Sequence, residues 1–496
     1  MIDIVIKPAD FEYDVQSLVQ AFYQGVEFQV NNNGNENSSE NRAVSCGYDD
    51  IKITVNIGAD SFEITVNDQN SHMEDIVICD MSDRRKAKNE LKKLLYNMLS
   101  AKTGKVLPWG NLTGIRPAKI PALMMEEGKE ESEVRQFMKE TYLLSDEKLN
   151  LALGIAKREN EILKGIPYKE GYSLYLGIPF CPTTCLYCSF TSYPITMYKH
   201  ITDKYVDTVI KEMEYVGGAL RDKVLNTVYI GGGTPTTLEP EQLRKLITAL
   251  KKHFDFSNVV EFTVEAGRPD SITEEKLITL KELGIDRISI NPQTMNQETL
   301  DVIGRFHTVE DVIDKFKMAR ECGFDNINMD LILGLPGEDV KKVQATLEKI
   351  CELGPDSLTV HSLAVKRAAR LNIQKEKYED VRMENDTELM EIAESYAKKM
   401  DMEAYYLYRQ KNMAGNQENV GYSRVGCEGI YNILMMGDKQ NVVAIGAGAT
   451  TKMMSKDRLS AKRIDNVKNV EIYIERINEM IERKRNYFEN NEFYTN

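Results

Sequence analysis

Three cysteines within eight residues are the part of this chain whose residue type and spacing most directly suggest chemistry. Cys181, Cys185 and Cys188 lie in the segment YLGIPFCPTTCLYCSF. Cysteine thiolates bind iron–sulfur clusters, and a 4Fe–4S cluster contains four iron atoms. Three ligands from one short loop would leave one iron without a protein ligand, so chemistry could take place at that iron.

Two other roles for clustered cysteines compete with this hypothesis. The chain has 8 cysteines in 496 residues, and its first residues, MIDIVIKPADFEYD, do not resemble a secretion signal, so disulfides are not expected. A structural zinc site commonly uses four nitrogen or sulfur ligands in two separated pairs, and no second pair follows Cys188. On spacing alone, zinc remains the alternative to an iron–sulfur cluster.

The overall composition is that of a globular protein with more than one core. A length of 496 residues, with 42% hydrophobic residues, predicts two or three domains. No run of about 18 apolar residues occurs, so we expect a cytoplasmic protein with no membrane association. A net charge of -14 argues against nucleic acid as a partner.

Residues 1–165 differ in pattern from the rest of the chain and predict a separate N-terminal α+β domain of unknown role. Alternating segments begin near the N-terminus, at Ile51 and at Ser61, and a helical pattern begins at Arg84. A polar run from Asn31 to Ala43 has no apolar residue until its last member and predicts a loop insertion.

From Tyr172 onwards, short β-strand patterns alternate with amphipathic helical stretches. The six predicted strands begin at Tyr172, Asn226, Val259, Arg287, Asn326 and Ser357. Six strand-and-helix units predict a parallel α/β barrel, complete or partial.

Several of these strands carry polar residues at every second position. Glu261, Thr263 and Glu265 alternate with apolar residues, and the strands from Arg287 and Asn326 repeat the pattern. Successive side chains of a strand point to opposite faces, whereas strands buried on both faces are nearly all apolar. The alternation therefore predicts a polar barrel interior that holds a ligand.

The residues with unusual chemistry follow the first two predicted strands. The cysteines come after the first strand, and a run of glycines, Gly231 to Gly233, comes with Thr234 after the second. Active sites of parallel barrels lie at the carboxyl ends of the strands. Glycines there let the backbone approach a ligand closely, because they have no Cβ.

Together, the C-x3-C-x2-C spacing, the glycine run and the polar strand ends resemble the radical S-adenosylmethionine (SAM) superfamily. The chain is most similar to the HemZ-like branch of the oxygen-independent coproporphyrinogen III dehydrogenase family, over about residues 170 to 455. The resemblance implies a partial parallel (β/α)6 radical SAM barrel over residues 166–375. It also implies a C-terminal extension, residues 376–496, that covers the substrate.

The resemblance further implies which residues bind the cofactors. Cys181, Cys185 and Cys188 would hold a 4Fe–4S cluster, and the amino and carboxylate groups of SAM would bind the fourth iron. Anionic Glu265 and Asp330 suit the cationic groups of SAM, and Arg305 suits its carboxylate. The positions that match the family's SAM contacts are Tyr175, Tyr187, Gly232, Gly233, Thr234, Glu265, Gln293, Arg305, Asp330, Ala364 and Thr450.

The implied reaction is the oxidative decarboxylation of coproporphyrinogen III to protoporphyrinogen IX in haem biosynthesis. An electron donor reduces the cluster, and a radical derived from SAM removes hydrogen from a propionate side chain, which then loses carbon dioxide and one electron to give a vinyl group. Propionates need basic partners. The candidates are Arg268, Lys366, Arg367, Arg370, Arg409 and Lys411.

Two departures from the family pattern support alternative functions. Phe190 stands where well-characterised dehydrogenases have a further cysteine, and related haem chaperones share the CSF sequence found here. Those chaperones have a histidine–asparagine motif where this chain has Tyr431 and Asn432. The alternatives are a haem-binding carrier, for which His307 and His361 are the histidines nearest the predicted site, and a haem-modifying radical SAM methyltransferase.

Overall fold

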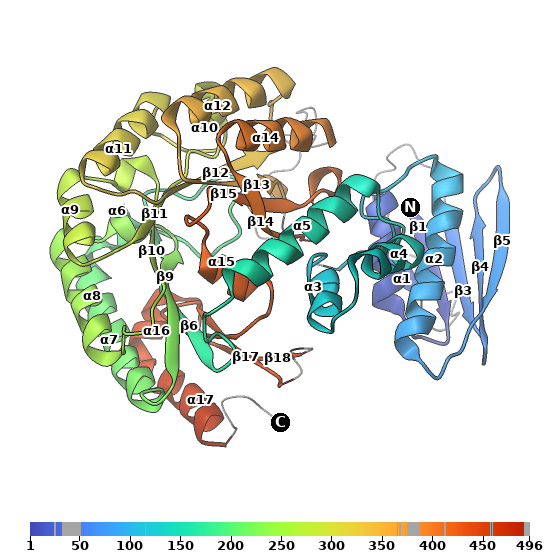
Figure 1. The fold of residues 1–496 in the computed structure, drawn as a ribbon, viewed down its shortest axis with the longest axis horizontal. Coiled ribbons are helices and arrows are strands. Elements are labelled where there is room, and N and C mark those ends of the chain that lie inside the picture. The colour runs from blue at the N-terminus through green and yellow to red at the C-terminus, as the bar shows by residue number, and fades with distance from the viewer. Residues whose placement is uncertain are drawn as a thin grey trace. The chain divides into compact units, whose positions relative to one another are not determined.

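In the computed structural model of the chain, the described residues are 1–23, 26–31, 51–114, 116–364, 366, 369–373, 387–410, 413–456, 458 and 460–490. They form two compact units (Figure 1). The first unit is Met1–Ala156 together with Gln410–Asn412, and the second is Lys157–Arg409 with Met413–Asn496. Apart from Asn31, the predicted polar loop lies outside the described residues.

The first unit is built on a five-stranded mixed sheet. The three strands predicted from alternation are present, and β1 pairs in parallel with both β2 and β3. The remaining strands pair antiparallel. In sheet order, the strands are β2 (Phe28–Asn31), β1 (Ile2–Lys7), β3 (Ile51–Ile57), β4 (Ser61–Asn67) and β5 (His72–Ile78).

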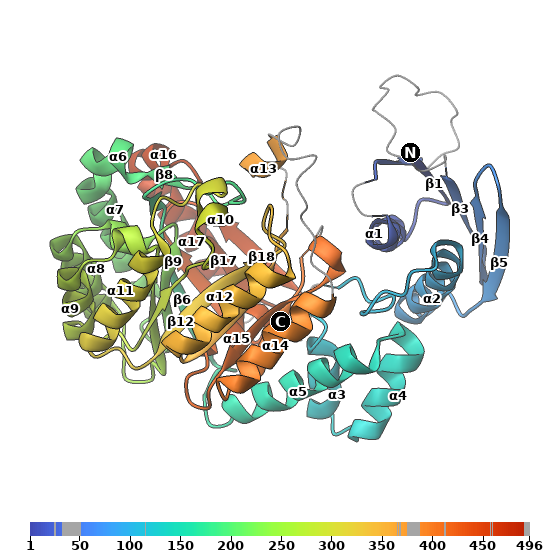
Figure 2. The same cartoon turned by 90° about the horizontal axis from the view of Figure 1, so that it is seen from above.

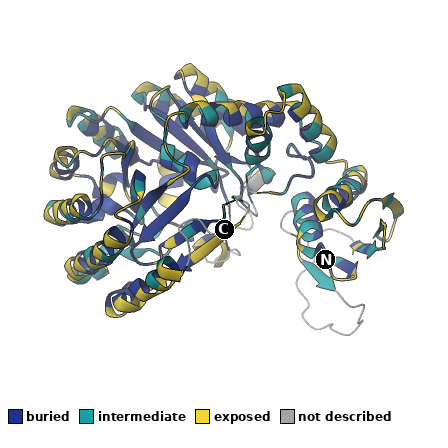
Figure 3. Ribbon diagram, turned by 60° about the horizontal axis from the view of Figure 1, so that its bottom comes forward, coloured by how far each residue is buried: buried dark blue, intermediate teal, exposed yellow. Residues whose placement is uncertain are grey.

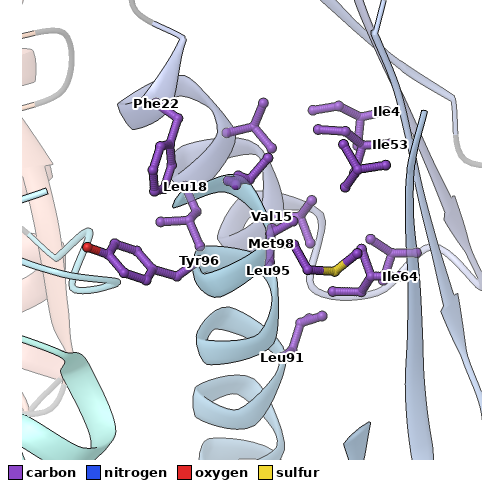
Figure 4. Packing of buried hydrophobic residues seen from close by; sticks show 14 of the residues in the cluster. Ile4, Val15, Leu18, Phe22, Ile53, Ile64, Leu91, Leu95, Tyr96 and Met98 are labelled. Atoms are coloured by element: carbon purple, nitrogen blue, oxygen red, sulfur yellow. The ribbon is translucent and has the colours of Figure 1, made fainter. Parts of the chain in front are cut away.

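One face of this sheet is covered by helices α1 (Glu12–Phe22) and α2 (Arg84–Thr103). Figure 4 shows the core between them, where Ile4 and Ile53 of the sheet face Val15 of α1. Helix α2 begins where Asp83 accepts hydrogen bonds from two backbone amides and ends at Gly104, whose φ is 68°. Three further helices follow: α3 (Lys119–Glu126), α4 (Glu131–Tyr142) and α5 (Asp146–Ile162).

The second unit contains the predicted six-unit parallel barrel. All six predicted strands are present and are hydrogen-bonded side by side in chain order. They are β6 (Gly171–Ile178), β9 (Val224–Gly232), β10 (Glu261–Gly267), β11 (Arg287–Ile290), β12 (Ile327–Leu333) and β13 (Ser357–Ser362).

Helices cover the outer face of these strands, as Figures 1 and 2 show. In Figure 3 the strands are dark blue, whereas the outward faces of the helices are yellow, as expected for amphipathic helices on a buried sheet. The helices are α7 (Thr202–Ala219), α8 (Pro240–His253), α9 (Glu274–Glu282), α10 (Gln297–Val302), α11 (Val309–Glu321), α12 (Val340–Leu353) and α14 (Thr387–Lys399).

The sheet stays open because later strands extend both of its edges, giving eleven strands. Strands β15 and β14 are added antiparallel beside β13, and β16 lies parallel to β6. These elements are β14 (Glu403–Tyr408), β15 (Asn419–Ser423), α15 (Ile430–Met436), β16 (Asn441–Ile445), β17 (Thr450–Met454), β18 (Ala461–Asp465), α16 (Val470–Glu475) and α17 (Ile477–Asn490). Within the described ranges, no helix is long and apolar enough to span a membrane.

Candidate active site

The cysteine loop leaves the carboxyl end of β6 and is fixed by backbone contacts on several sides. Cys181 ends the two-residue strand β7 (Phe180–Cys181), which pairs with β8 (Tyr193–Pro194). Cys185 is buried, whereas Cys181 and Cys188 are half-buried, and none of the three is in a disulfide within the described chain. Two hydrogen bonds join the loop to the segment after α10: Leu186 N to Ile303 O at 2.9 Å, and Thr183 Oγ1 to Gly304 O at 3.1 Å.

The glycine run at the end of β9 packs directly against this loop. The amides of Gly233 and Thr234 donate to the carbonyls of Ile178 and Phe180, both at 2.7 Å. The Thr234 hydroxyl lies 3.6 Å from Cys181 Sγ. A Cβ on Gly233 would lie 2.5 Å from Phe180 O and 2.9 Å from Cys181 Sγ. Glycine is therefore required at position 233 for the end of β9 to approach the first cysteine.

Glu265, at the end of β10, is the first of two carboxylates on the polar face of the barrel strands. The Tyr229 hydroxyl donates to Glu265 Oε1 at 2.6 Å, and the Gly232 amide donates to Oε2 at 3.3 Å. Burial raises the pKa of Glu265 to about 7, and nearby Asp330 acts in the same direction. Glu265 can therefore change its charge near neutral pH.

Asp330, on β12, is the second carboxylate and behaves in the opposite way. Burial alone would raise its pKa, but His361, with Nε2 at 3.9 Å, and the Asn328 amide, at 2.7 Å from Oδ1, outweigh burial and lower it. The Tyr408 hydroxyl lies 3.4 Å from His361 Nδ1. Asp330 is thus an anion at neutral pH, held by side chains from β12 and β13.

Gln293 and Arg305 bring two more polar side chains to this end of the barrel. Gln293 has a φ of 68°, which is unusual for a residue with a side chain, and its backbone bonds to Asp330 O and Ile332 N on β12. Arg305 is buried and donates to Asn291 O. Burial disfavours its charge, but Tyr187 and the Cys185 thiol raise its pKa above the ordinary value.

Several buried polar atoms in β11 and in the segments that follow it have no hydrogen-bond partner in the described structure. They are Ser289 Oγ, Asn291 Oδ1, Gln293 Oε1 and Arg305 Nε. Buried polar atoms are nearly always hydrogen-bonded in native proteins, so unpaired ones indicate an absent polar ligand.

The residues present fit a 4Fe–4S cluster with SAM. The loop offers three thiols, and the neighbouring strand ends offer two carboxyls, a guanidinium and an amide for the charged groups of SAM. No three His, Cys, Asp or Glu side chains in the described ranges converge on a single metal ion. A cluster has no such requirement, because its thiolates bind different iron atoms.

The remaining predicted SAM positions have different surroundings. Tyr175 stacks with Tyr229, with ring centroids 6.3 Å apart, and the charge of Arg305 acts on Tyr187. Ala364 lies just beyond β13 and bridges to Met413. Thr450 is exposed on β17, where its hydroxyl donates to Asp465 at 2.6 Å. None of these contacts joins Ala364 or Thr450 to Glu265 or Asp330, so a role of Ala364 and Thr450 in binding SAM stays a prediction.

The six basic residues predicted to meet propionates have different surroundings. Arg268 is 3% exposed and bonded to Asp270, and Arg409 is 6% exposed and bonded to Asn416. Lys366 and Arg370 are exposed beside the cysteine loop. Arg367 and Lys411 lie outside the described residues.

Sequence reasoning did not anticipate the stack of Tyr175, Tyr229 and Tyr431 inside the barrel. Tyr431, at the start of α15, is 4% exposed, and its backbone amide donates to Glu261 Oε2 at 3.0 Å. Its ring lies 6.4 Å from that of Tyr175. Tyr175 and Tyr229 are paired positions in β6 and β9, a register that the structure shows and the strand patterns do not contain.

Comparison with known proteins places this chain in a family. The radical SAM superfamily matches residues 175–350. The oxygen-independent coproporphyrinogen-III oxidase-like protein HemZ of Bacillus subtilis is 42% identical over 420 residues, which are 83% of each chain. The heme chaperone HemW of the same organism is 35% identical over 56% of this chain and 70% of its own.

Among solved structures, coproporphyrinogen III oxidase (HemN) from Escherichia coli matches with a TM-score of 0.50. The match covers 65% of this chain and 73% of that one at 22% identity, so it supports the fold alone. The sequence match to HemZ extends over most of both chains. The chain therefore belongs to the HemZ-like family of the radical SAM superfamily, whose members bind a 4Fe–4S cluster and S-adenosylmethionine.

Proposed function

We propose that the chain catalyses the oxygen-independent oxidative decarboxylation of coproporphyrinogen III to protoporphyrinogen IX. One observation carries this proposal: at one end of the barrel, the cysteine loop lies beside polar side chains from β9 to β13. Some of their atoms have no hydrogen-bond partner within the described chain. When bound there, the cluster and SAM supply an electron and a carbon radical that abstracts hydrogen.

The chain's own residues bind and orient SAM in this proposal. Arg305 binds the SAM carboxylate, and Asp330, which stays charged, binds the cationic end of the molecule. Glu265 adds a second negative charge once it ionises near pH 7. Gln293 Oε1 accepts a hydrogen bond from the ligand and so gains the partner it lacks within the described chain.

Phe190, Lys366 and Arg370 form the substrate edge of the cysteine loop. Lys366 Nζ lies 5.6 Å from the centroid of the Phe190 ring, which is 70% exposed. Arg370 Nη1 donates to Thr184 O at 3.3 Å. An exposed aromatic ring beside a cation, with a second cation bonded to the same loop, suits a tetrapyrrole, which has an apolar ring face and carboxylates at its rim.

Tyr431 favours the enzyme over the haem carrier. The resemblance to haem chaperones aligns this position with a histidine, which could bind haem iron. Tyr431 is instead packed under Tyr229, with ring centroids 4.5 Å apart. Its side chain could reach a bound haem only if the stack were rebuilt.

An anaerobic assay tests the proposal. We would reconstitute the cluster in the full chain, add dithionite, SAM, coproporphyrinogen III and an electron acceptor, and measure protoporphyrinogen IX and 5'-deoxyadenosine. Both products are expected from the wild type and from a Cys322→Ala control, in which the changed thiol ends α11. Neither is expected from Cys185→Ala.

Two other outcomes would overturn the proposal in different ways. Formation of 5'-deoxyadenosine without decarboxylation would exclude coproporphyrinogen III and keep the radical chemistry. Stable haem binding with no SAM cleavage would establish a carrier.

A further inference from the structure

Arg268 is directed at the cysteine loop by a bulge at the end of β10. In the pairing of β10 with β11, Glu265 faces Ser289 and Gly267 faces Ile290, so Ala266 is an extra residue. Gly267 has a φ of 59°, which a residue with a side chain rarely adopts. Bulges of this kind turn the chain and re-aim the side chain that follows.

The guanidinium of Arg268 is held rigidly between a carboxylate and the cysteine loop. Its Nε and Nη2 donate to the two oxygens of Asp270, at 3.0 and 2.6 Å. Its Nη1 donates to Thr183 O at 3.1 Å and Thr183 Oγ1 at 2.7 Å, and lies 3.8 Å from Cys185 Sγ. The side chain is 3% exposed, and each of its three nitrogens donates to Asp270 or to Thr183. It is therefore not available to a substrate carboxylate.

Cys185 therefore lies beside two buried cations, because Arg305 also contacts its thiol. His307, which is 2% exposed, is acted on by the same two arginines. Burial, followed by the charge of Arg305 and with a contribution from Arg268, lowers the pKa of His307 to about 4. The loop's middle thiol is thus buried beside two guanidinium groups, one of which is paired with Asp270.

We infer that Arg268 is a positioning residue that fixes Cys185 and raises the reduction potential of the cluster bound by the loop. Net charge, hydrogen bonds to sulfur and solvent exposure set the potential of such clusters. Arg268 supplies a positive charge and an N–H donor to the ligand sulfur, and both stabilise the more negative, reduced form. This role does not depend on which tetrapyrrole is the substrate.

The test is a redox titration of the reconstituted full chain, followed by electron paramagnetic resonance, without substrate. The titrated step adds one electron to the oxidised cluster, and dithionite is oxidised in exchange. Arg268→Met is expected to have a more negative midpoint. At the wild-type midpoint potential, its ratio of reduced to oxidised cluster should fall about tenfold, which corresponds to 59 mV for one electron.

Arg268→Lys separates charge from geometry, because lysine keeps the charge but cannot pair with Asp270 through two parallel bonds. Its midpoint should lie between those of the wild type and Arg268→Met. Arg244→Met is the matched control: it removes an exposed arginine that pairs with Glu282 in the same unit, and it should leave the midpoint unchanged.

Iron and sulfide are measured in every sample. An unchanged midpoint in Arg268→Met with a full cluster would overturn the inference. Loss of the cluster in both the Met and the Lys variants would also overturn it, because Arg268 would then serve only to build the loop.

Discussion

Tyr431 lies flat against Tyr229, with ring centroids 4.5 Å apart and 20° between the ring planes. The pair joins α15, from the C-terminal part of the chain, to the second strand of the barrel. It thereby fills the barrel interior beneath the carboxylates of Glu265 and Asp330, and the ligand-binding end rests on this aromatic layer.

Removing this ring should destabilise the second unit. Tyr431→Ala is expected to lower the free energy of unfolding by about 3 kcal/mol, because a buried aromatic ring is lost and a cavity remains. Tyr431→Phe keeps the stack and should cost far less. Denaturant unfolding followed by circular dichroism measures both. Equal losses in the two variants would mean that the hydroxyl matters more than the stacking.

The affinity for SAM should depend on pH through Glu265. Its pKa of about 7 means that the carboxyl is mostly neutral below that pH and charged above it. If the anion binds SAM, the Kd should fall about tenfold per pH unit up to about pH 7 and then level off. Glu265→Gln keeps an acceptor for Tyr229 but cannot ionise, so SAM should bind it weakly, with a Kd that is nearly flat between pH ~6 and ~8, ~1 unit either side of the midpoint. Anaerobic calorimetry provides the comparison, and parallel profiles would assign the pH dependence to another group.

Gly233→Ala should disturb the cysteine loop because the new Cβ would meet Phe180 O and Cys181 Sγ. Forcing an atom into such a contact costs about 1–3 kcal/mol. We expect less iron per chain after reconstitution and a lower melting temperature. Gly218→Ala is the control, since a Cβ there meets no described atom within 4 Å, and helix propensity favours alanine by about 1 kcal/mol. Full iron content in Gly233→Ala would show that the cysteine loop can shift to make room for the Cβ and still bind the cluster.

A buried ion pair should hold the C-terminal helix to the barrel. Lys484 of α17 and Glu212 of α7 are 2.6 Å apart and fully buried, and Glu212 also accepts from Tyr473 and the Gly446 amide. Lys484→Met leaves the buried Glu212 carboxylate without a cation beside it. The free energy of unfolding should fall by about 3–5 kcal/mol.

Two comparisons check this assignment by chemical unfolding. Adding Glu212→Gln to Lys484→Met should recover part of the loss, because the buried charge is removed. Breaking the exposed pair of Arg485 with Glu482 should cost under about 1 kcal/mol. No recovery in the double variant would mean that Lys484 acts through packing.

Lys366→Gln and Arg370→Gln should each weaken binding of coproporphyrinogen III. Losing one charged contact to a propionate costs about 1.4 kcal/mol or more, which is a tenfold rise in KM. The rate of SAM cleavage in the absence of substrate should not change. Steady-state assays of both reactions separate the two effects, and an unchanged KM in both variants would place the substrate elsewhere.

The barrel could be predicted from the sequence because the residue patterns that indicate it are local. Alternating polar and apolar positions, as in Glu261 to Glu265, specify both a strand and the face it turns inward. The cysteine and glycine runs lie at strand ends, where chain order alone brings them together. These features need no knowledge of distant contacts.

Other features of the site depend on contacts that no short pattern contains. The re-aiming of Arg268 follows from an unpaired residue at Ala266, and Gln293 takes a left-handed φ without being a glycine. Tyr431 enters the barrel from a helix some 200 residues beyond Tyr229, so its partner could not be inferred from spacing. Strands β14 to β18 were also missed as parts of the same sheet, because they join it out of chain order.

The order of the strands limits how the barrel can deform. Strand β15 lies toward one edge of the open sheet and β16 beyond the other side, and only the segment through α15 connects them. In that segment, the backbone amide of Tyr431 donates a hydrogen bond to Glu261 in the middle of the sheet. The segment therefore connects the two sides of the opening through the sheet's centre. Spreading of the strands would break the hydrogen bond between Tyr431 and Glu261. On the proposed function, coproporphyrinogen III would enter by movement of the loops at the strand ends, while the frame that holds the cysteine loop keeps its width.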